Sequence, residues 1–107
     1  METITQTRNR VFKGYKSNEI GSLSPVALIL KLYDYIIVNS KRHNQSNVNA
    51  GLTQLIAALN FDYKDVSLGL FRLYAYCQAQ ARKGNFVEVE KLIGELRSAW
   101  AQAFKLS

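Results

Sequence analysis

Apolar side chains recur at helical spacing in four stretches of the chain, and the first stretch is the most apolar. Ser24 suits the N-cap position, because its hydroxyl can accept from the free amides of a first turn, and Pro25 suits the first helical position. The predicted helix then runs from Val26 to Val38 and is apolar on nearly every side. Such a helix belongs at the centre of a bundle, or beneath something that covers its outer face.

The second predicted helix is short and follows a polar linker. Residues 39–49 are almost entirely polar, so we expect them to end the first helix and to connect it to the next one. Between residues 50 and 60 the apolar positions fall at i, i+3, i+4 and i+7, at Leu52, Leu55, Ile56 and Leu59. A helix of this length depends on packing for its stability.

The third and fourth predicted helices carry clear apolar stripes. We expect Asp62 or Asp65 to cap the third helix, which covers residues 66–82, and Gly84-Asn85 to stop it. Its stripe consists of Val66, Leu70, Leu73, Tyr74, Cys77 and Ala81. The fourth helix keeps the same spacing from residue 89 to residue 103, through Val89, Leu92, Ile93, Leu96, Trp100 and Ala103.

No segment alternates apolar and polar residues with the period of a strand, so we predict an all-α fold. Short connections favour antiparallel neighbours, which makes residues 24–107 an antiparallel up-down four-helix bundle. Residues 1–23 are polar and basic, with Gly14 and Gly21 as helix breakers. We predict that they form an N-terminal extended arm whose spaced apolar side chains can dock on the bundle.

The composition fits one globular domain. The chain has 107 residues, of which 48% are apolar and 21% charged, close to the averages for such domains. No apolar run is long enough to span a bilayer, and the N-terminal segment has no signal-peptide core, so we expect a cytoplasmic protein without membrane insertion. The single cysteine, Cys77, lies on an apolar stripe, where a buried and inert thiol is expected.

The formal net charge of +6 raises the question of an acidic partner. A basic balance is typical of proteins that bind nucleic acid. The basic residues are spread along the chain, however, and the longest runs are the pairs Lys41-Arg42 and Arg82-Lys83. We therefore favour a solvated positive surface and do not expect nucleic acid as the partner, although a basic nucleic-acid-binding module is the alternative.

The sequence offers no constellation of catalytic residues. His43 is the only histidine, and it has neither a second imidazole nor an orienting partner nearby in the sequence. Asp34 lies within the first apolar run, where we expect a solvent-facing or capped structural carboxylate. Glycine-rich phosphate loops and Glu-x-x-His pairs are absent. We therefore predict that the protein is not an enzyme and has no catalytic residue, no metal ligand and no cofactor.

The aromatic content points to binding. The chain has six tyrosines, five phenylalanines and one tryptophan. Tyr33 and Tyr35 are two residues apart, so they cannot share one narrow helical stripe. Four short helices leave some of this surface uncovered, which favours grooves that accept apolar helices of another protein. Two alternatives are that the aromatics simply fill a small core, or that the bundle self-associates around its first helix.

A set of motifs, in one order along the chain, supports a binding role. The first part contains Tyr15-Lys-Ser-Asn-Glu-Ile20, Ser22-Leu-Ser-Pro25 and Leu28-Ile-Leu-Lys-Leu-Tyr-Asp34, and the later motifs are Leu70-Phe-Arg-Leu-Tyr-Ala-Tyr76 and Glu95-Leu-Arg-Ser-Ala-Trp100. Together they resemble the flagellar secretion chaperones, the FliS family, over about residues 15–104. The intervals between the motifs are shorter than is usual in that family, and Tyr35 stands where a glycine is typical, so a shorter groove is implied.

The resemblance implies a cytoplasmic helical bundle that binds the C-terminal segment of flagellin as helices. It further implies that binding prevents premature polymerisation and delivers the subunit to the flagellar export apparatus, whose gate is a further expected partner. We expect a monomer or a weak dimer. The resemblance assigns Tyr15, Asn18 and Ile20 to a movable arm that covers part of the binding surface. It assigns six more residues to the core and the groove floors: Leu28, Leu32, Tyr33, Leu70, Leu73 and Tyr74.

Overall fold

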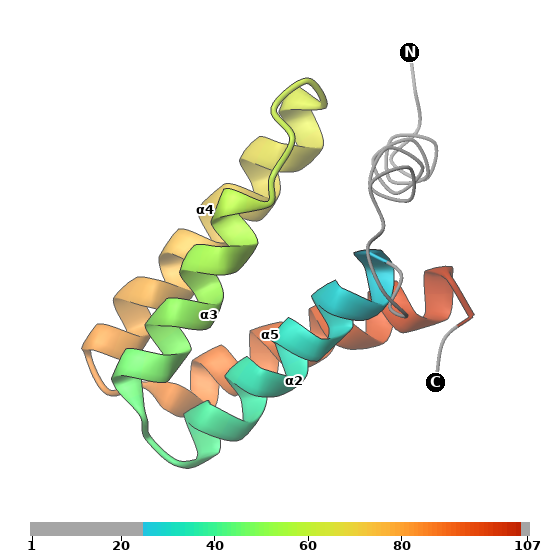
Figure 1. The fold of residues 1–107 in the computed structure, drawn as a ribbon. Coiled ribbons are helices and arrows are strands. Elements are labelled where there is room, and N and C mark those ends of the chain that lie inside the picture. Colours follow the sequence, from blue (N-terminus) through green and yellow to red (C-terminus); the bar gives the residue numbers. More distant parts are fainter. Residues whose placement is uncertain (1–24, 106–107) are drawn as a thin grey trace.

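Four α-helices make up the part of the chain that the computed structural model describes, residues 25–105 (Figure 1). They are α2 (Pro25–Lys41), α3 (Gln45–Ala57), α4 (Lys64–Arg82) and α5 (Phe86–Ala103). Each helix runs in the opposite direction to the one before it, so the predicted all-α, up-down four-helix bundle is confirmed. The predicted arm at residues 1–23 and the Ser24 cap lie outside the described residues.

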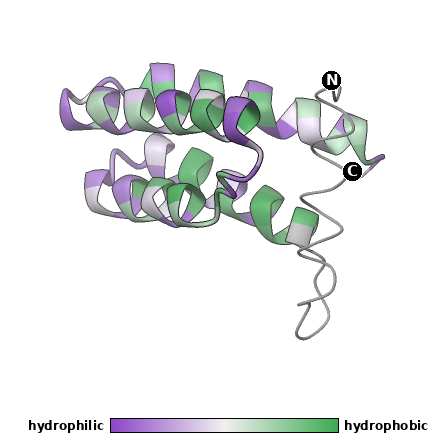
Figure 2. Ribbon diagram, turned by 90° about the horizontal axis from the view of Figure 1, so that it is seen from above, coloured by the Kyte–Doolittle hydropathy of each residue, from purple (hydrophilic) through white to green (hydrophobic). Residues whose placement is uncertain are grey.

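The helices form two stacked layers, which Figure 2 shows from above. The α2–α3 hairpin is one layer and the α4–α5 hairpin is the other, with α2 packed on α5 and α3 packed on α4. Within each layer the two helices diverge from the end that holds the α2–α3 and α4–α5 turns (Figure 1). We call that end the closed end, and the end with the α3–α4 turn the open end.

The predicted linker at residues 39–49 is wrong, because most of these polar residues are helical. Only residues 42–44 separate α2 from α3. The Asn44 side chain caps α3 by accepting a hydrogen bond from the Asn47 amide at 3.0 Å. The Asn39 side chain donates to the Tyr35 carbonyl at 2.8 Å and accepts from the Asn47 side chain at 3.0 Å. These asparagines therefore join the two helices instead of forming a loop.

The predicted aspartate cap of the third helix is also wrong. α3 ends at Ala57, and Tyr63 occupies the N-cap position of α4 without a side-chain hydrogen bond. The turn is held instead by Ser67, a buried residue whose hydroxyl donates to the Asn60 carbonyl at 2.5 Å. Neither Asp62 nor Asp65 takes part in that contact. The hydrogen bond comes from Ser67, which lies within α4, and not from a residue at the start of the helix.

Both turns at the closed end pass through the left-handed backbone region. Gly84 has φ 79°, which confirms the predicted stop at Gly84-Asn85. His43 has φ 54°, which is uncommon for a residue with a side chain. Its ring stacks on that of Phe86 at a centroid distance of 5.0 Å, so the α2–α3 turn packs on the start of α5.

A hydrogen bond between two tyrosine hydroxyls lies at the centre of the core. Tyr33 of α2 and Tyr74 of α4 belong to different layers, and their hydroxyl oxygens are 2.7 Å apart. The Trp100 ring of α5 meets Tyr33 edge-on at 6.2 Å. Burial raises the pKa of both tyrosines, that of Tyr74 to about 12. Around them lie the buried apolar side chains Val26, Leu30, Ile36, Val48, Leu52, Leu55, Cys77, Ala81, Phe86, Val89, Ile93 and Ala101.

Gly51 lies at a close approach of α2 and α3. A Cβ atom at this position would lie 2.7 Å from Cγ1 of Ile36 and 3.3 Å from a ring carbon of Tyr35. Ile36 is fully buried and has little room to move. The two helices of this layer can therefore touch here only because residue 51 has no side chain.

We expect Gly51→Ala to lower the free energy of unfolding by about 1–3 kcal/mol, because the added methyl overpacks the contact with Ile36. Gly94→Ala on α5 is the matched control. A Cβ there meets nothing within 4 Å, so the better helix propensity of alanine should raise stability by up to about 1 kcal/mol. Chemical denaturation of the full-length variants measures both values, and stabilisation by both substitutions would contradict the close contact.

Tyr33→Phe and Tyr74→Phe should each cost about 1–3 kcal/mol, because each leaves the other hydroxyl buried without its partner. The double variant removes both polar groups, so its cost should be clearly smaller than the sum of the two. A double-mutant cycle by denaturant titration measures this coupling. Additive costs would mean that the hydroxyl contact contributes nothing.

The raised tyrosine pKa values predict a loss of stability at alkaline pH. The folded state favours the protonated phenols, so their contribution is complete below the unfolded pKa of about 10 and falls as the pH rises towards the folded pKa of Tyr74, about 12. The Cys77 thiol, whose pKa burial raises to about 11, acts in the same direction from about pH 9. The unfolding free energy of the double Tyr→Phe variant should fall less steeply over this range.

Candidate helix-docking groove

An apolar groove runs between α2 and α3 in the outer surface of their layer. Its lining consists of Leu28, Lys31, Leu32 and Tyr35 from α2 and Ala50, Gly51 and Gln54 from α3, around an open volume of about 370 Å³. We call it the α2–α3 groove. The close contact of Gly51 with Tyr35 lies within its lining, since a Cβ atom at residue 51 would be 3.3 Å from the Tyr35 ring.

The groove exists because α2 has more apolar sides than its neighbours cover. Tyr33 and Ile36 are fully buried and face the core. Leu28, Leu32 and Tyr35 follow at i, i+4 and i+7, which puts them on a second stripe of the same helix. Leu28 keeps 49% of its surface exposed and Tyr35 keeps 42%. The sequence predicted that the outer face of this helix would need a cover, and among the described residues the stripe stays partly open.

The α3 side of the groove is free of charge. No ionisable residue occurs from Gln45 to Ala57, and Ala50 and Gln54 are exposed where they line the groove. Fully buried centres of protein interfaces are depleted of charged residues. An uncharged helix face beside an apolar stripe is therefore well suited to desolvation by a partner.

Lys31 is the one charged residue of the groove lining, and the other two charged residues of α2, Asp34 and Lys41, pair with residues of α5. Asp34 accepts hydrogen bonds from Arg97, the second one from Nη2 at 3.3 Å, and Lys41 pairs with Glu90 at 3.5 Å. The hydrogen bond to Asp34 raises the pKa of the Arg97 guanidinium. Asp34 thus ties α2 to α5 as a half-exposed surface pair, in agreement with the structural role expected from the sequence. Such pairs contribute little to stability.

The structure places the predicted binding residues in three environments. Leu28 and Leu32 line the groove. Tyr33 and Tyr74 are buried in the core, while Leu70 and Leu73 of α4 are half-buried away from the groove lining. Tyr15, Asn18 and Ile20 lie outside the described residues.

Sequence reasoning missed the α3 half of the groove and the role of Tyr35. The i, i+4, i+7 spacing of Leu28, Leu32 and Tyr35 was visible, because a second stripe beside the buried one marks a helix with two apolar faces. Nothing in the sequence indicated that Gly51 would face this stripe, since that depends on how α2 and α3 cross.

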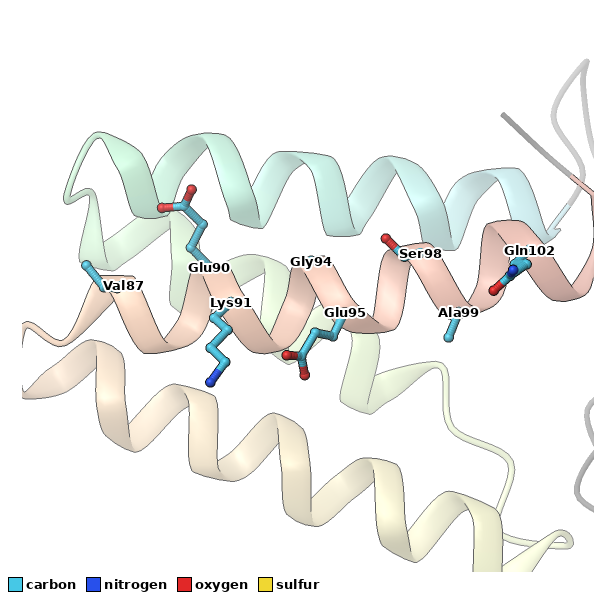
Figure 3. A pocket seen from close by; sticks show the side chains of 8 residues that line it. All are labelled: Val87, Glu90, Lys91, Gly94, Glu95, Ser98, Ala99 and Gln102. Carbon is cyan, nitrogen blue, oxygen red and sulfur yellow. The ribbon is translucent and has the colours of Figure 1, made fainter.

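A larger hollow lies along the outer face of α5, with a volume of about 670 Å³ (Figure 3). Its eight lining residues all come from this one helix, and Glu90, Lys91 and Glu95 bring three charged side chains to it. A single-helix surface of this kind has no walls to hold a ligand. The smaller α2–α3 groove, which two helices line with mostly apolar surface, is the better candidate for a binding site.

The described residues contain no grouping of three or more His, Cys, Asp and Glu side chains that could hold a metal ion. Cys77 is fully buried, as predicted, and burial raises the pKa of its thiol to about 11. Among the helices of residues 25–105, none has the length and apolar content needed to cross a membrane.

Comparison of the chain with known proteins identifies no relative. No protein-family model, curated protein or solved structure matches this chain, so the resemblance to the flagellar secretion chaperones rests on the sequence motifs.

Proposed function

We propose that this protein is a cytoplasmic export chaperone of the flagellar type, which binds the C-terminal segment of flagellin as a helix in the α2–α3 groove. Binding there keeps the subunit from polymerising early and presents it to the flagellar export apparatus. The proposal is supported by the partly exposed stripe of Leu28, Leu32 and Tyr35 and by the ordered motifs of the sequence.

The proposal depends on the exposed stripe, because this stripe is apolar surface that a client helix can cover on binding. A disordered segment that folds on binding loses conformational freedom, and this cost must be offset by apolar burial at ~25 cal/mol per Å². Leu28 to Tyr35 span about two helical turns, or about 10 Å. The groove therefore fits two or three successive anchor side chains of an amphipathic helix at i, i+4 and i+7.

One observation favours the alternative of a nucleic-acid-binding module. The fold brings the basic pairs Lys41-Arg42 and Arg82-Lys83 to the closed end, although they lie far apart in the sequence. Their charge is partly neutralised, because Lys41 pairs with Glu90. A nucleic-acid complex of this end would weaken steeply with salt, whereas docking in the apolar groove depends little on salt.

Titration of a flagellin C-terminal peptide into the full-length protein tests the proposal, with calorimetry for affinity and circular dichroism for helix formation. Leu28→Asp should weaken binding at least tenfold, because it puts a charge at a desolvated anchor position. Val87→Asp on α5 is the matched control, since Val87 is 77% exposed and lies outside the groove. Equal affinities of the two variants would exclude the groove, and no binding by the unaltered protein would exclude this client.

A further inference from the structure

The α2–α3 groove contains one charged side chain, and we propose that it selects the kind of helix that docks there. The expected partner is an amphipathic helix that carries a carboxylate beside its apolar stripe, placed to pair with Lys31. This inference rests on the proposed function, because it takes the groove to be a helix-docking site, and it adds the charge that the docked helix must carry.

Lys31 lies in the groove lining between Leu28 and Leu32 in sequence. It is exposed and forms no ion pair with any residue between 25 and 105. The nearest carboxylate on α2 belongs to Asp34, which is bound to Arg97 on the α5 side. The charge of Lys31 is therefore available to a partner.

The remainder of the lining neither neutralises nor repeats this charge. Leu28, Leu32 and Tyr35 are apolar or uncharged, and α3 contributes only Ala50, Gly51 and Gln54. A helix docked over the groove thus meets an apolar floor and one ammonium group. An acidic side chain beside its anchors gains a partner, while a basic side chain at the same place meets a like charge.

The position of the charge makes it a determinant of specificity more than of affinity. A lysine stem can lie over apolar surface while its ammonium group stays in water, so the pair forms without full desolvation. Charges at the edge of an interface mainly steer encounter and exclude wrong partners. Basic side chains outnumber acidic ones among the described residues, which adds to the attraction of an acidic helix.

A peptide helix fits these features better than a nucleic acid. Binding of a phosphate backbone relies on several cations along a track. The groove offers one cation, and the rest of its lining is apolar or neutral. This combination matches an amphipathic helix with an acidic flank.

The test uses the full-length protein and two synthetic peptides of about 18 residues, long enough to form a helix on binding. Both carry the same leucine stripe at i, i+4 and i+7, and the flanking positions are glutamate in one peptide and lysine in the other. The unaltered protein should bind the glutamate peptide about five to ten times more tightly, with the difference shrinking at high salt.

Lys31→Glu should reverse this order, while Lys91→Glu, an identical charge change on the outer face of α5, should alter the ratio less than about twofold. Equal binding of both peptides, with no difference between the two variants, would overturn the charge preference and leave the docking groove intact. No binding of either peptide would remove the groove and the proposed function together. Displacement of the glutamate peptide by a DNA oligonucleotide would assign Lys31 to nucleic acid and overturn the proposal.

Discussion

The apolar surface of α2 is the constraint from which the rest of the architecture follows. A helix that is apolar on nearly every side needs cover from several directions, and the bundle supplies α5 on one side and α3 on another. Tyr33 also links α2 to the diagonal helix α4, because its hydroxyl group forms a hydrogen bond with that of Tyr74. These neighbours do not cover the stripe at Leu28 and Tyr35 completely, so part of the apolar surface of α2 stays exposed.

The polar groups inside the core explain why this arrangement is specific. The Tyr33 and Tyr74 hydroxyls hydrogen-bond to each other, and this contact can form only if the two layers stack in one register. Ser40 is the exception, since its buried hydroxyl has no partner among the described residues.

Periodicity identified the helices and most of the core. Residues such as Val89, Ile93 and Trp100 share one face of their helix, and that apolar face is buried. Composition misled at residues 39–49, where asparagines look like a loop but cap and cross-link two helices. The groove was only half predictable for a similar reason. The stripe on α2 is a property of one segment, whereas the placement of Gly51 against Tyr35 and Ile36 is a property of two helices and appears only once they are packed.

The contact at Gly51 also has a mechanical meaning. A Cβ atom at residue 51 would collide with the Ile36 side chain, so α2 and α3 are packed closely at this point. Leu28 lies eight residues along α2 from Ile36, a lever arm of about 12 Å. If a larger residue at position 51 tilted α2 by about 10° around this point, Leu28 would move by about 2 Å. The missing side chain at Gly51 therefore bears on the width of the α2–α3 groove as well as on the packing of its layer.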